Sequence, residues 1–174
     1  KVTISSSGIV PALIRMSDTV PVSLAISLHA PDDSLRDVLV PINQKYPIKE
    51  LMKACHYYLK AGTQERHILF EYVMLDGVND SVEHARSLSK LLNYWFESES
   101  AKVNLIPFNP FPESQYKTSS HATIDKFQDV LFQAGIRTTT RRTRGDDVDA
   151  ACGQLAGKVL DKSRRNAERN RLLS

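Results

Sequence analysis

Cys152 is the residue of this sequence best suited to nucleophilic chemistry. It lies in the segment RRTRGDDVDAACGQLAG, residues 141–157, between Ala151 and Gly153, so a bulky substrate could approach its sulfur. The nearby Arg144 would stabilise a thiolate, which is the form of cysteine that attacks. A buried, unreactive thiol is the alternative interpretation, and the sequence leaves both open.

Metal binding is the less favoured interpretation of the same segment. Asp146, Asp147 and Asp149 could supply oxygen ligands, but their spacing does not fit an EF-hand loop and no histidine is close. Acidic residues in the first turn of a helix complement its dipole, and this interpretation is favoured. The second cysteine, Cys55, is expected in the core because it lies on the apolar stripe of a predicted helix.

Two polar residues follow predicted strands and are candidates for ligand contact. His29 ends an apolar strand and is followed by Ala30 and Pro31, which stop the strand. Asn109 lies in the segment IPFNPFP, whose prolines favour extended backbone and would hold the amide in a fixed direction. A purely structural histidine and a rigid covering loop are the alternatives.

Predicted strands and the helices between them indicate an α/β fold. Strands are expected at residues 2–5, 22–28, 68–75, 102–106 and 136–142, the last being more polar. Apolar residues recur at helical spacing over residues 48–59, 82–92 and 124–131. This alternation predicts parallel pairing through right-handed crossovers. After Gly153 the sequence predicts one long, charged helix.

One face of the second predicted strand is small and polar. In VSLAISLH the residues Leu24, Ile26 and Leu28 alternate with Ser23, Ala25, Ser27 and His29. An antiparallel sheet with one face in water would give the same pattern, but the interleaved helices make that interpretation less favoured. We therefore predict a barrel or half-barrel whose inner face holds a ligand and whose outer face packs on helices.

The composition is that of one globular domain. Of the 174 residues, 41% are hydrophobic and 25% are charged, which excludes collagen-like, disordered and membrane-spanning classes. No apolar run approaches the roughly 18 residues of a spanning helix, and no signal peptide is recognisable, so a cytoplasmic location is expected. The first residue is not Met, and we expect the sequence to begin inside a longer protein.

Charge is distributed unevenly along the chain. Residues 1–136 carry 13 basic and 15 acidic groups, a net charge of -2, whereas residues 137–174 carry 10 basic and 5 acidic groups, a net charge of +5. A basic C-terminal segment is an electrostatic footprint for a phosphate backbone, although a solvated surface would show the same balance.

Five segments together resemble one enzyme family. In chain order over residues 1–165 they are VTISSSGIVP, AISLHAPDDSLRDVLVPIN, FEYVMLDGVND, VNLIPFNPFP and RRTRGDDVDAACGQLAG. They resemble the RlmN/Cfr family of radical S-adenosylmethionine enzymes, and more closely the members that methylate carbon 2 of adenine than those that methylate carbon 8. The resemblance implies the C-terminal half of a partial (β/α)6 barrel with parallel strands over residues 1–152, followed by a basic C-terminal helix or tail over residues 153–174.

The resemblance also implies roles for individual residues. S-adenosylmethionine would be contacted by Ser5, Ser27, Leu28, His29 and Asn109. Cys152 would carry a methyl group as S-methylcysteine, a second S-adenosylmethionine would supply the radical that activates this group for addition to adenine, and a second cysteine would release the RNA by forming a disulfide with Cys152. The implied partners are 23S ribosomal RNA, transfer RNA and an electron donor, with no membrane. RNA contacts are expected from Arg141, Arg142, Arg144, Lys162, Arg164 and Arg165.

Several family motifs are absent from this sequence. They are the CxxxCxxC motif that binds a [4Fe-4S] cluster, the GE pair, the proton-moving acidic residue, the resolving cysteine and the N-terminal RNA-binding part, all upstream in family members. We therefore expect the cluster to be bound by residues outside this chain and the chain alone to be catalytically silent. Its first strand would leave an open edge prone to self-association. An RNA-binding module without chemistry and a degenerate paralogue with a structural role are the alternatives.

Overall fold

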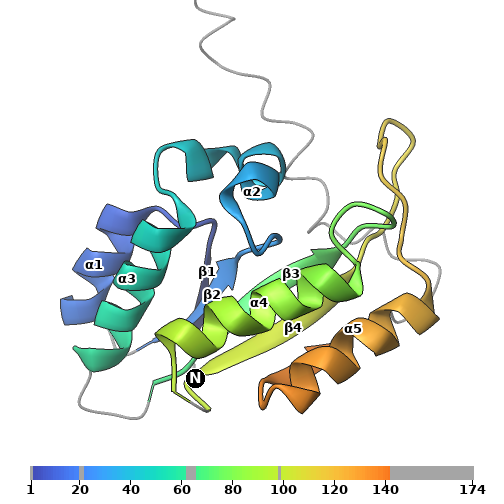
Figure 1. Ribbon diagram of the computed structural model, residues 1–174. Helices are drawn as coiled ribbons and strands as arrows, with labels where there is room; N and C mark the ends of the chain where they lie inside the picture. Colours follow the sequence, from blue (N-terminus) through green and yellow to red (C-terminus); the bar gives the residue numbers. More distant parts are fainter. Residues whose placement is uncertain (1, 20–21, 62–65, 98, 142–174) are drawn as a thin grey trace, which may run out of the picture. The chain divides into compact units, whose positions relative to one another are not determined.

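Five parallel strands alternate with helices along the chain (Figure 1). The computed structural model describes residues 2–19, 22–61, 66–97 and 99–141, which lie within one compact unit, Lys1–Arg142. The strands are β1 (Thr3–Ser6), β2 (Ser23–Ser27), β3 (Ile68–Met74), β4 (Ala101–Pro107) and β5 (Arg137–Thr140). Their order in the sheet is their order in the chain, and every neighbouring pair is parallel. The predicted α/β class is confirmed, and the antiparallel alternative is wrong.

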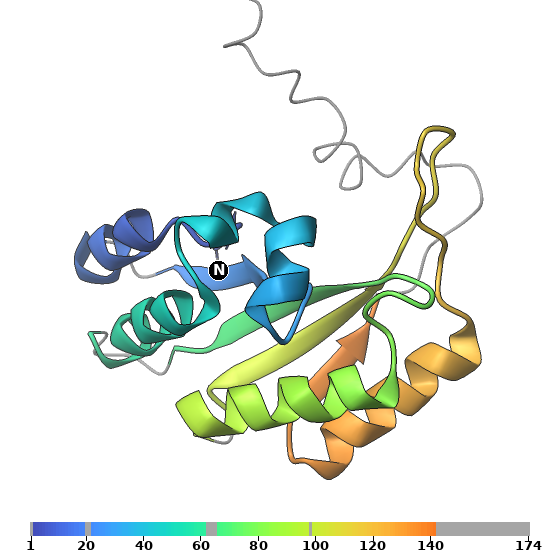
Figure 2. The same cartoon turned by 45° about the horizontal axis from the view of Figure 1, so that its top comes forward.

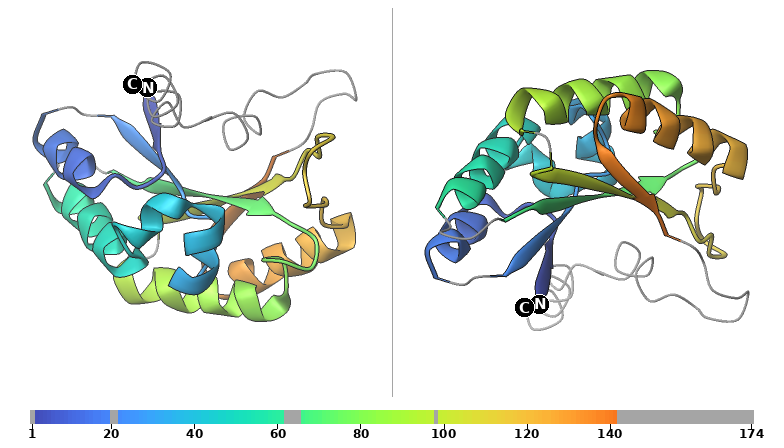
Figure 3. Two further views of the ribbon diagram at one scale, coloured as in Figure 1. Left: turned by 90° about the horizontal axis from the view of Figure 1, so that it is seen from above. Right: turned by 90° about the horizontal axis from the view of Figure 1, so that it is seen from below.

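The helices of the described residues all lie on the same face of the sheet in both views of Figure 3. They are α1 (Val10–Thr19), α2 (Asp33–Leu39), the 3-10 helix η1 (Pro41–Gln44), α3 (Ile48–Lys60), α4 (Val82–Trp95) and α5 (His121–Gln133). The periodicity of the sequence predicted α3, α4 and α5. It did not predict α1, which contains Pro11 in its first turn, nor the short α2, which begins where the Asp32 side chain accepts a hydrogen bond from the Leu35 backbone N–H at 3.0 Å.

The core lies between this helical layer and the sheet. Along β3, alternate residues from Ile68 to Met74 are fully buried, whereas Leu69, Glu71 and Val73 between them are partly exposed. Cys55 of α3 is 0% exposed in this core, and burial raises the pKa of its thiol to about 12. The prediction that Cys55 is a core residue is confirmed.

The opposite face of the sheet carries no described helix, and we call it the open face (Figure 3). The strand register places Ser5, Ala25, Leu69 and Lys102 in one row of this face. The apolar alternates of β2, Leu24 and Ile26, are 0% exposed on the helical side. The predicted division of β2 into a small polar face and an apolar face is therefore confirmed.

The sheet of the described residues is open at both edges. Within this part of the chain β1 pairs only with β2, and β5 pairs only with β4. Closing a barrel requires further strands, because eight strands are typical of a closed barrel of this kind. Within the described ranges, no helix is both long and apolar enough to cross a bilayer.

Candidate functional site

A row of polar side chains crosses the open face. The register pairs Ser27 with Glu71, Glu71 with Asn104, and Asn104 with Thr139 on four successive strands. The Thr139 hydroxyl donates a hydrogen bond to Asn104 Oδ1 at 3.1 Å. Only Ser27 of this row was predicted as a site residue. The signal for Glu71 and Asn104 is their alternation with buried apolar residues on β3 and β4.

His29 lies where β2 leaves the sheet, in the left-handed region of backbone conformation with φ 60°. Its Nδ1 accepts a hydrogen bond from the Val73 backbone N–H at 3.1 Å, so the imidazole occupies the place of a main-chain acceptor beside β3. This acceptor role puts the proton of the neutral ring on Nε2. Burial, and to a smaller extent the charge of Arg36, lowers the pKa of His29 to about 4, so the ring is neutral at pH 7.

Asn79 ties the end of β3 to His29 from the following turn. Its side chain is fully buried and donates hydrogen bonds to the carbonyls of His29 at 2.9 Å and Val73 at 2.6 Å. Its Oδ1 accepts a bond from the Leu75 N–H at 2.9 Å, and its own carbonyl accepts one from the Tyr72 hydroxyl at 2.7 Å. Two hydrogen bonds therefore hold His29 in its left-handed backbone conformation: Val73 N–H donates to its imidazole, and the Asn79 side chain donates to its carbonyl.

Leu28 differs from the other candidates because its side chain is 0% exposed in the core. Its main-chain N–H donates to the Glu71 carbonyl at 3.0 Å, and its carbonyl accepts from Arg36 Nε at 3.1 Å. Sequence alternation already placed Leu28 on the apolar face, so any contact of Leu28 with a ligand would involve its backbone.

Asn109 follows β4 and is exposed in a loop that extends away from the sheet (Figure 2). The loop is organised by three aromatic rings, with the Phe108 centroid 6.2 Å from that of Phe111 and 6.3 Å from that of Tyr116. An antiparallel bridge between Leu75 and Thr118 connects the loop to the end of β3. The rings and this bridge limit the positions that Asn109 can take.

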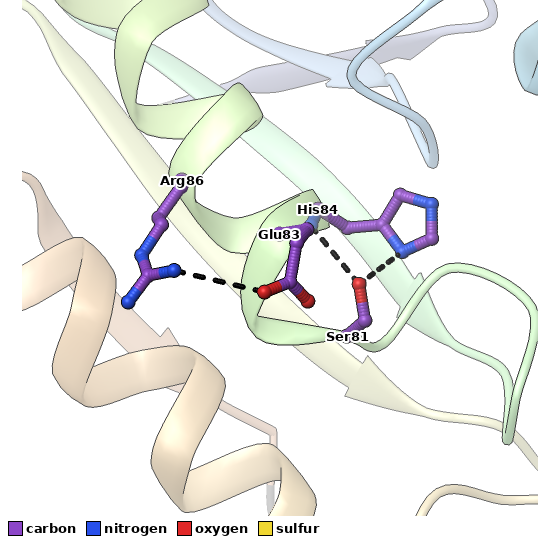
Figure 4. A network of polar contacts seen from close by, with 4 residues as sticks. All are labelled: Ser81, Glu83, His84 and Arg86. Carbon is purple, nitrogen blue, oxygen red and sulfur yellow. Dashed lines mark hydrogen bonds and ion pairs between the residues drawn. The ribbon is translucent and has the colours of Figure 1, made fainter.

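Ser81 and His84 form a pair that resembles a nucleophile and its base (Figure 4). Ser81 Oγ lies 2.9 Å from His84 Nδ1, but it also accepts the His84 backbone N–H at 3.1 Å as the N-cap of α4. Glu83 in the same turn pairs with Arg86 at 3.6 Å and not with the histidine. The arrangement is a helix cap.

The remaining predicted residues lie at or beyond the end of the described chain. Arg141 is exposed, and its N–H donates to the Leu105 carbonyl at 2.8 Å. Outside the described residues lie Cys152, Arg142, Arg144, Lys162, Arg164 and Arg165. Among the residues that the structure describes, no group of three or more His, Cys, Asp or Glu side chains could hold a metal ion.

Comparison with curated proteins finds close relatives that share one description. The chain is 67% identical over 169 residues to the dual-specificity RNA methyltransferase RlmN of Ruthia magnifica subsp. Calyptogena magnifica, a match that covers 97% of this chain and 46% of the relative. It is 51% identical over 177 residues to the RlmN of Stenotrophomonas maltophilia (strain R551-3), covering 99% and 44%. The chain thus spans about half the length of the curated relatives it matches. No protein-family model matches the chain.

Comparison with solved structures also finds a methyltransferase of which this chain matches about half. A radical SAM methyltransferase from Sphaerobacter thermophilus superimposes with a TM-score of 0.80 at 44% identity, over 87% of this chain and 43% of that one. A domain of pyruvate-formate lyase-activating enzyme from Bacteroides vulgatus ATCC 8482 superimposes with a TM-score of 0.59 at 15% identity over 80% of both chains, and shares the fold alone. The predicted half-barrel architecture is confirmed by these neighbours.

Proposed function

Because this chain is a homologue of the RlmN dual-specificity RNA methyltransferases over about half of their length, we propose that it supplies one side of an S-adenosylmethionine site for methylation of adenine carbon 2 in RNA. The observation that carries this proposal is the open face itself. Its polar row lies on a parallel sheet whose described helices are all on the other side, and the candidate residues cluster toward the carboxyl ends of the strands.

The chemistry of the open face and of the loops at its carboxyl edge fits S-adenosylmethionine. Ser5 and Ser27 offer hydroxyls, Asn109 an amide, and His29 a neutral ring whose Nε2–H can donate a hydrogen bond. These groups match the hydroxyls, ring nitrogens and carboxylate of the ligand, with Leu28 contributing main chain only. When bound in this family, S-adenosylmethionine supplies both a methyl group and, with a reduced [4Fe-4S] cluster, a radical. In this proposal the cluster is held by residues outside this chain.

Cys152 is the proposed carrier of the methyl group. Its sequence neighbours, Ala151 and Gly153, are small, as a nucleophile that an adenine must approach requires. The flanking arginines and the basic residues 153–174 would hold RNA phosphates, with 23S ribosomal RNA and transfer RNA as the substrates. A cytoplasmic location agrees with these substrates and with an electron donor that reduces the cluster.

A hybrid enzyme tests this proposal. In it, this chain replaces the matching half of the Ruthia magnifica RlmN, and the hybrid is expressed in bacteria whose own RlmN has been deleted. The proposal predicts 2-methyladenine in ribosomal and transfer RNA, detected by mass spectrometry of nucleosides. A hybrid that is folded, contains the iron-sulfur cluster and yet leaves adenine unmethylated would contradict it.

A further inference from the structure

Arg36 of α2 is the largest fully buried side chain of the described residues, with 0% of its surface exposed. All of its nitrogens donate hydrogen bonds. Nε binds the Leu28 carbonyl at 3.1 Å, Nη2 binds the carbonyls of Ser27 at 3.0 Å and Ser7 at 2.9 Å, and Nη1 binds Asn43 Oδ1 at 2.8 Å. One guanidinium therefore joins the loop after β1 to the loop after β2.

These two loops directly follow the strands that carry Ser5 and Ser27, and the second loop contains Leu28 and His29. Ser5 lies two residues before Ser7, and His29 directly follows Ser27 and Leu28, whose carbonyls Arg36 binds. Both loops lie at the carboxyl edge of the sheet, where the strand ladder ends and carbonyls lose their partners. We infer that Arg36 is a positioning residue, which sets the relative placement of Ser5, Ser27 and His29 for S-adenosylmethionine. This inference rests on the proposed function.

The residues around Arg36 leave space for its guanidinium and balance its charge. A Cβ added to Gly8 would lie 3.3 Å from Arg36 Nη2 and 3.1 Å from Leu51 Cδ1, and Gly8 has φ 103°. The buried charge is balanced through Asn43, whose Nδ2 donates to Asp33 Oδ1 at 2.9 Å and to Asp37 Oδ1 at 2.7 Å.

A role limited to general stability would not require this residue. A buried ionic network is frequently no more stabilising than apolar side chains of the same volume, so stability alone gives little reason for an arginine here. The planar fork of donors reaches carbonyls of two loops at fixed spacing, which the single ammonium of lysine cannot reproduce. Since Arg36 is wholly buried, it acts on a ligand through the groups it holds.

The chain offers a matched control in Arg66. Its Nη1 donates to the carbonyls of Ser17 at 3.2 Å and Tyr58 at 3.1 Å, and its guanidinium lies 4.7 Å from the centre of the Tyr58 ring. Arg66 shortly precedes β3, at the amino edge of the sheet. It has the same chemistry as Arg36, with main-chain carbonyl partners, away from the candidate site.

The test uses the hybrid enzyme with Arg36→Met, Arg36→Lys and Arg66→Met. The primary measurement is the Kd for S-adenosylmethionine by isothermal titration calorimetry, and the second is the split between KM and kcat. We expect Arg36→Met to raise Kd and KM at least about tenfold while kcat at saturation falls less than about threefold, and Arg36→Lys to raise both constants about threefold. Arg66→Met should lower Tm and leave both constants within about twofold of the unsubstituted hybrid.

The outcomes separate this inference from the proposed function. Suppose that the unsubstituted hybrid binds S-adenosylmethionine and methylates RNA, and that the Kd of the Arg36 variants for S-adenosylmethionine lies within about twofold of its own. Arg36 then only stabilises the fold, and the inference is wrong. Should Arg36→Met fail to fold, Arg36→Lys decides by the same threshold. A folded, cluster-containing unsubstituted hybrid without binding or methylation contradicts the proposed function, and the positioning role with it.

Discussion

The imidazole of His29 accepts a hydrogen bond from the backbone N–H of Val73 at 3.1 Å, so a side chain from the end of β2 completes the edge of β3 after β2 has left the sheet. A histidine can do this only while Nδ1 is unprotonated. The same bond fixes the ring with Nε2–H as its free donor. Structure and ligand contact are therefore compatible roles of His29, although the sequence presented them as alternatives.

The lowered pKa of His29 makes the stability of the fold dependent on pH. Burial and Arg36 lower the pKa of folded His29 to about 4, below the ordinary value of 6.5 that applies to the unfolded chain. Between pH 4 and pH 6.5 the unfolded chain binds more protons at His29 than the folded chain does. The stability that the neutral, buried ring contributes is therefore complete above pH 6.5 and is lost as the pH falls toward 4. The loss is on the order of 3 kcal/mol, and urea unfolding at pH 7.5, 6.0 and 5.0 would measure it.

A histidine variant isolates this effect. His29→Gln should remove most of the pH dependence between pH 6.5 and 4, whereas His121→Gln, at the exposed start of α5, should retain it. Equal pH dependence in His29→Gln and the unsubstituted chain would show that other groups cause it.

Asn79→Ala should be strongly destabilising. The substitution leaves the Leu75 N–H and the carbonyls of His29 and Val73 without their side-chain partner, and these groups are buried around a residue that is 0% exposed. The expected loss is about 2 to 4 kcal/mol in the free energy of unfolding. Asn93→Ala is the control, because Asn93 is exposed and donates a single bond to the Ala134 carbonyl. A loss of stability in Asn79→Ala as small as that in Asn93→Ala would contradict the role of Asn79 in holding His29 to the end of β3.

The two faces of the sheet were predictable because strand residues alternate between them. Ser23, Ala25 and Ser27 oppose Leu24 and Ile26, and this contrast indicates a polar inner face from the sequence alone. The elements at the carboxyl edge were less predictable. A charged residue such as Arg36 is expected at the surface, and its burial depends on carbonyls that the chain brings together from positions 7, 27 and 28.

The burial of Asn79 was not predicted, for a related reason. The sequence DGVND is typical of an exposed turn, but the turn folds back on β3 and buries the amide. The φ of 60° at His29 has no sequence signal either, since glycine and asparagine are the usual residues in that conformation. The placement of Cys152 and the basic residues after Arg141 remains a prediction, because they lie outside the described residues.

Gly8→Ala should cost more stability than Gly77→Ala. Both glycines have positive φ, 103° and 66°, but an added Cβ meets Leu51 and Arg36 at Gly8 and nothing within 4 Å at Gly77. We expect a loss of about 1 kcal/mol at Gly77 from backbone strain alone and at least about 2 kcal/mol at Gly8. Thermal unfolding of the two variants measures the difference, and equal losses would contradict the close approach of Arg36 to Gly8.

Neutralising the basic tail should weaken RNA binding in a salt-dependent manner. In the hybrid enzyme, Lys162, Arg164 and Arg165 are replaced together by glutamine, and affinity for transfer RNA is measured between about 50 and 200 mM salt. For each phosphate that a tail side chain no longer neutralises, the slope of log K against log salt should become shallower by about 0.7 to 0.9. Methylation of Cys152 itself, which precedes RNA binding in the proposed reaction, should be unaffected.

A matched triple substitution on the helical layer controls for charge alone. Lys49, Lys53 and Lys60 are exposed on α3, and their replacement by glutamine removes the same formal charge. An unchanged salt slope in the tail variant, or the same change in both variants, would show that the tail is only a solvated surface.

The most direct test of the proposed function is Cys152→Ala in the hybrid enzyme, with Cys55→Ala as the matched control. Adenine methylation is measured per folded, cluster-containing protein, together with affinity for transfer RNA. The account predicts no 2-methyladenine from Cys152→Ala with RNA affinity within about twofold of the unsubstituted hybrid, and retained methylation from Cys55→Ala, whose thiol is buried in the core. Methylation by Cys152→Ala at a rate near that of the unsubstituted hybrid would contradict the assignment of Cys152 as the methyl carrier.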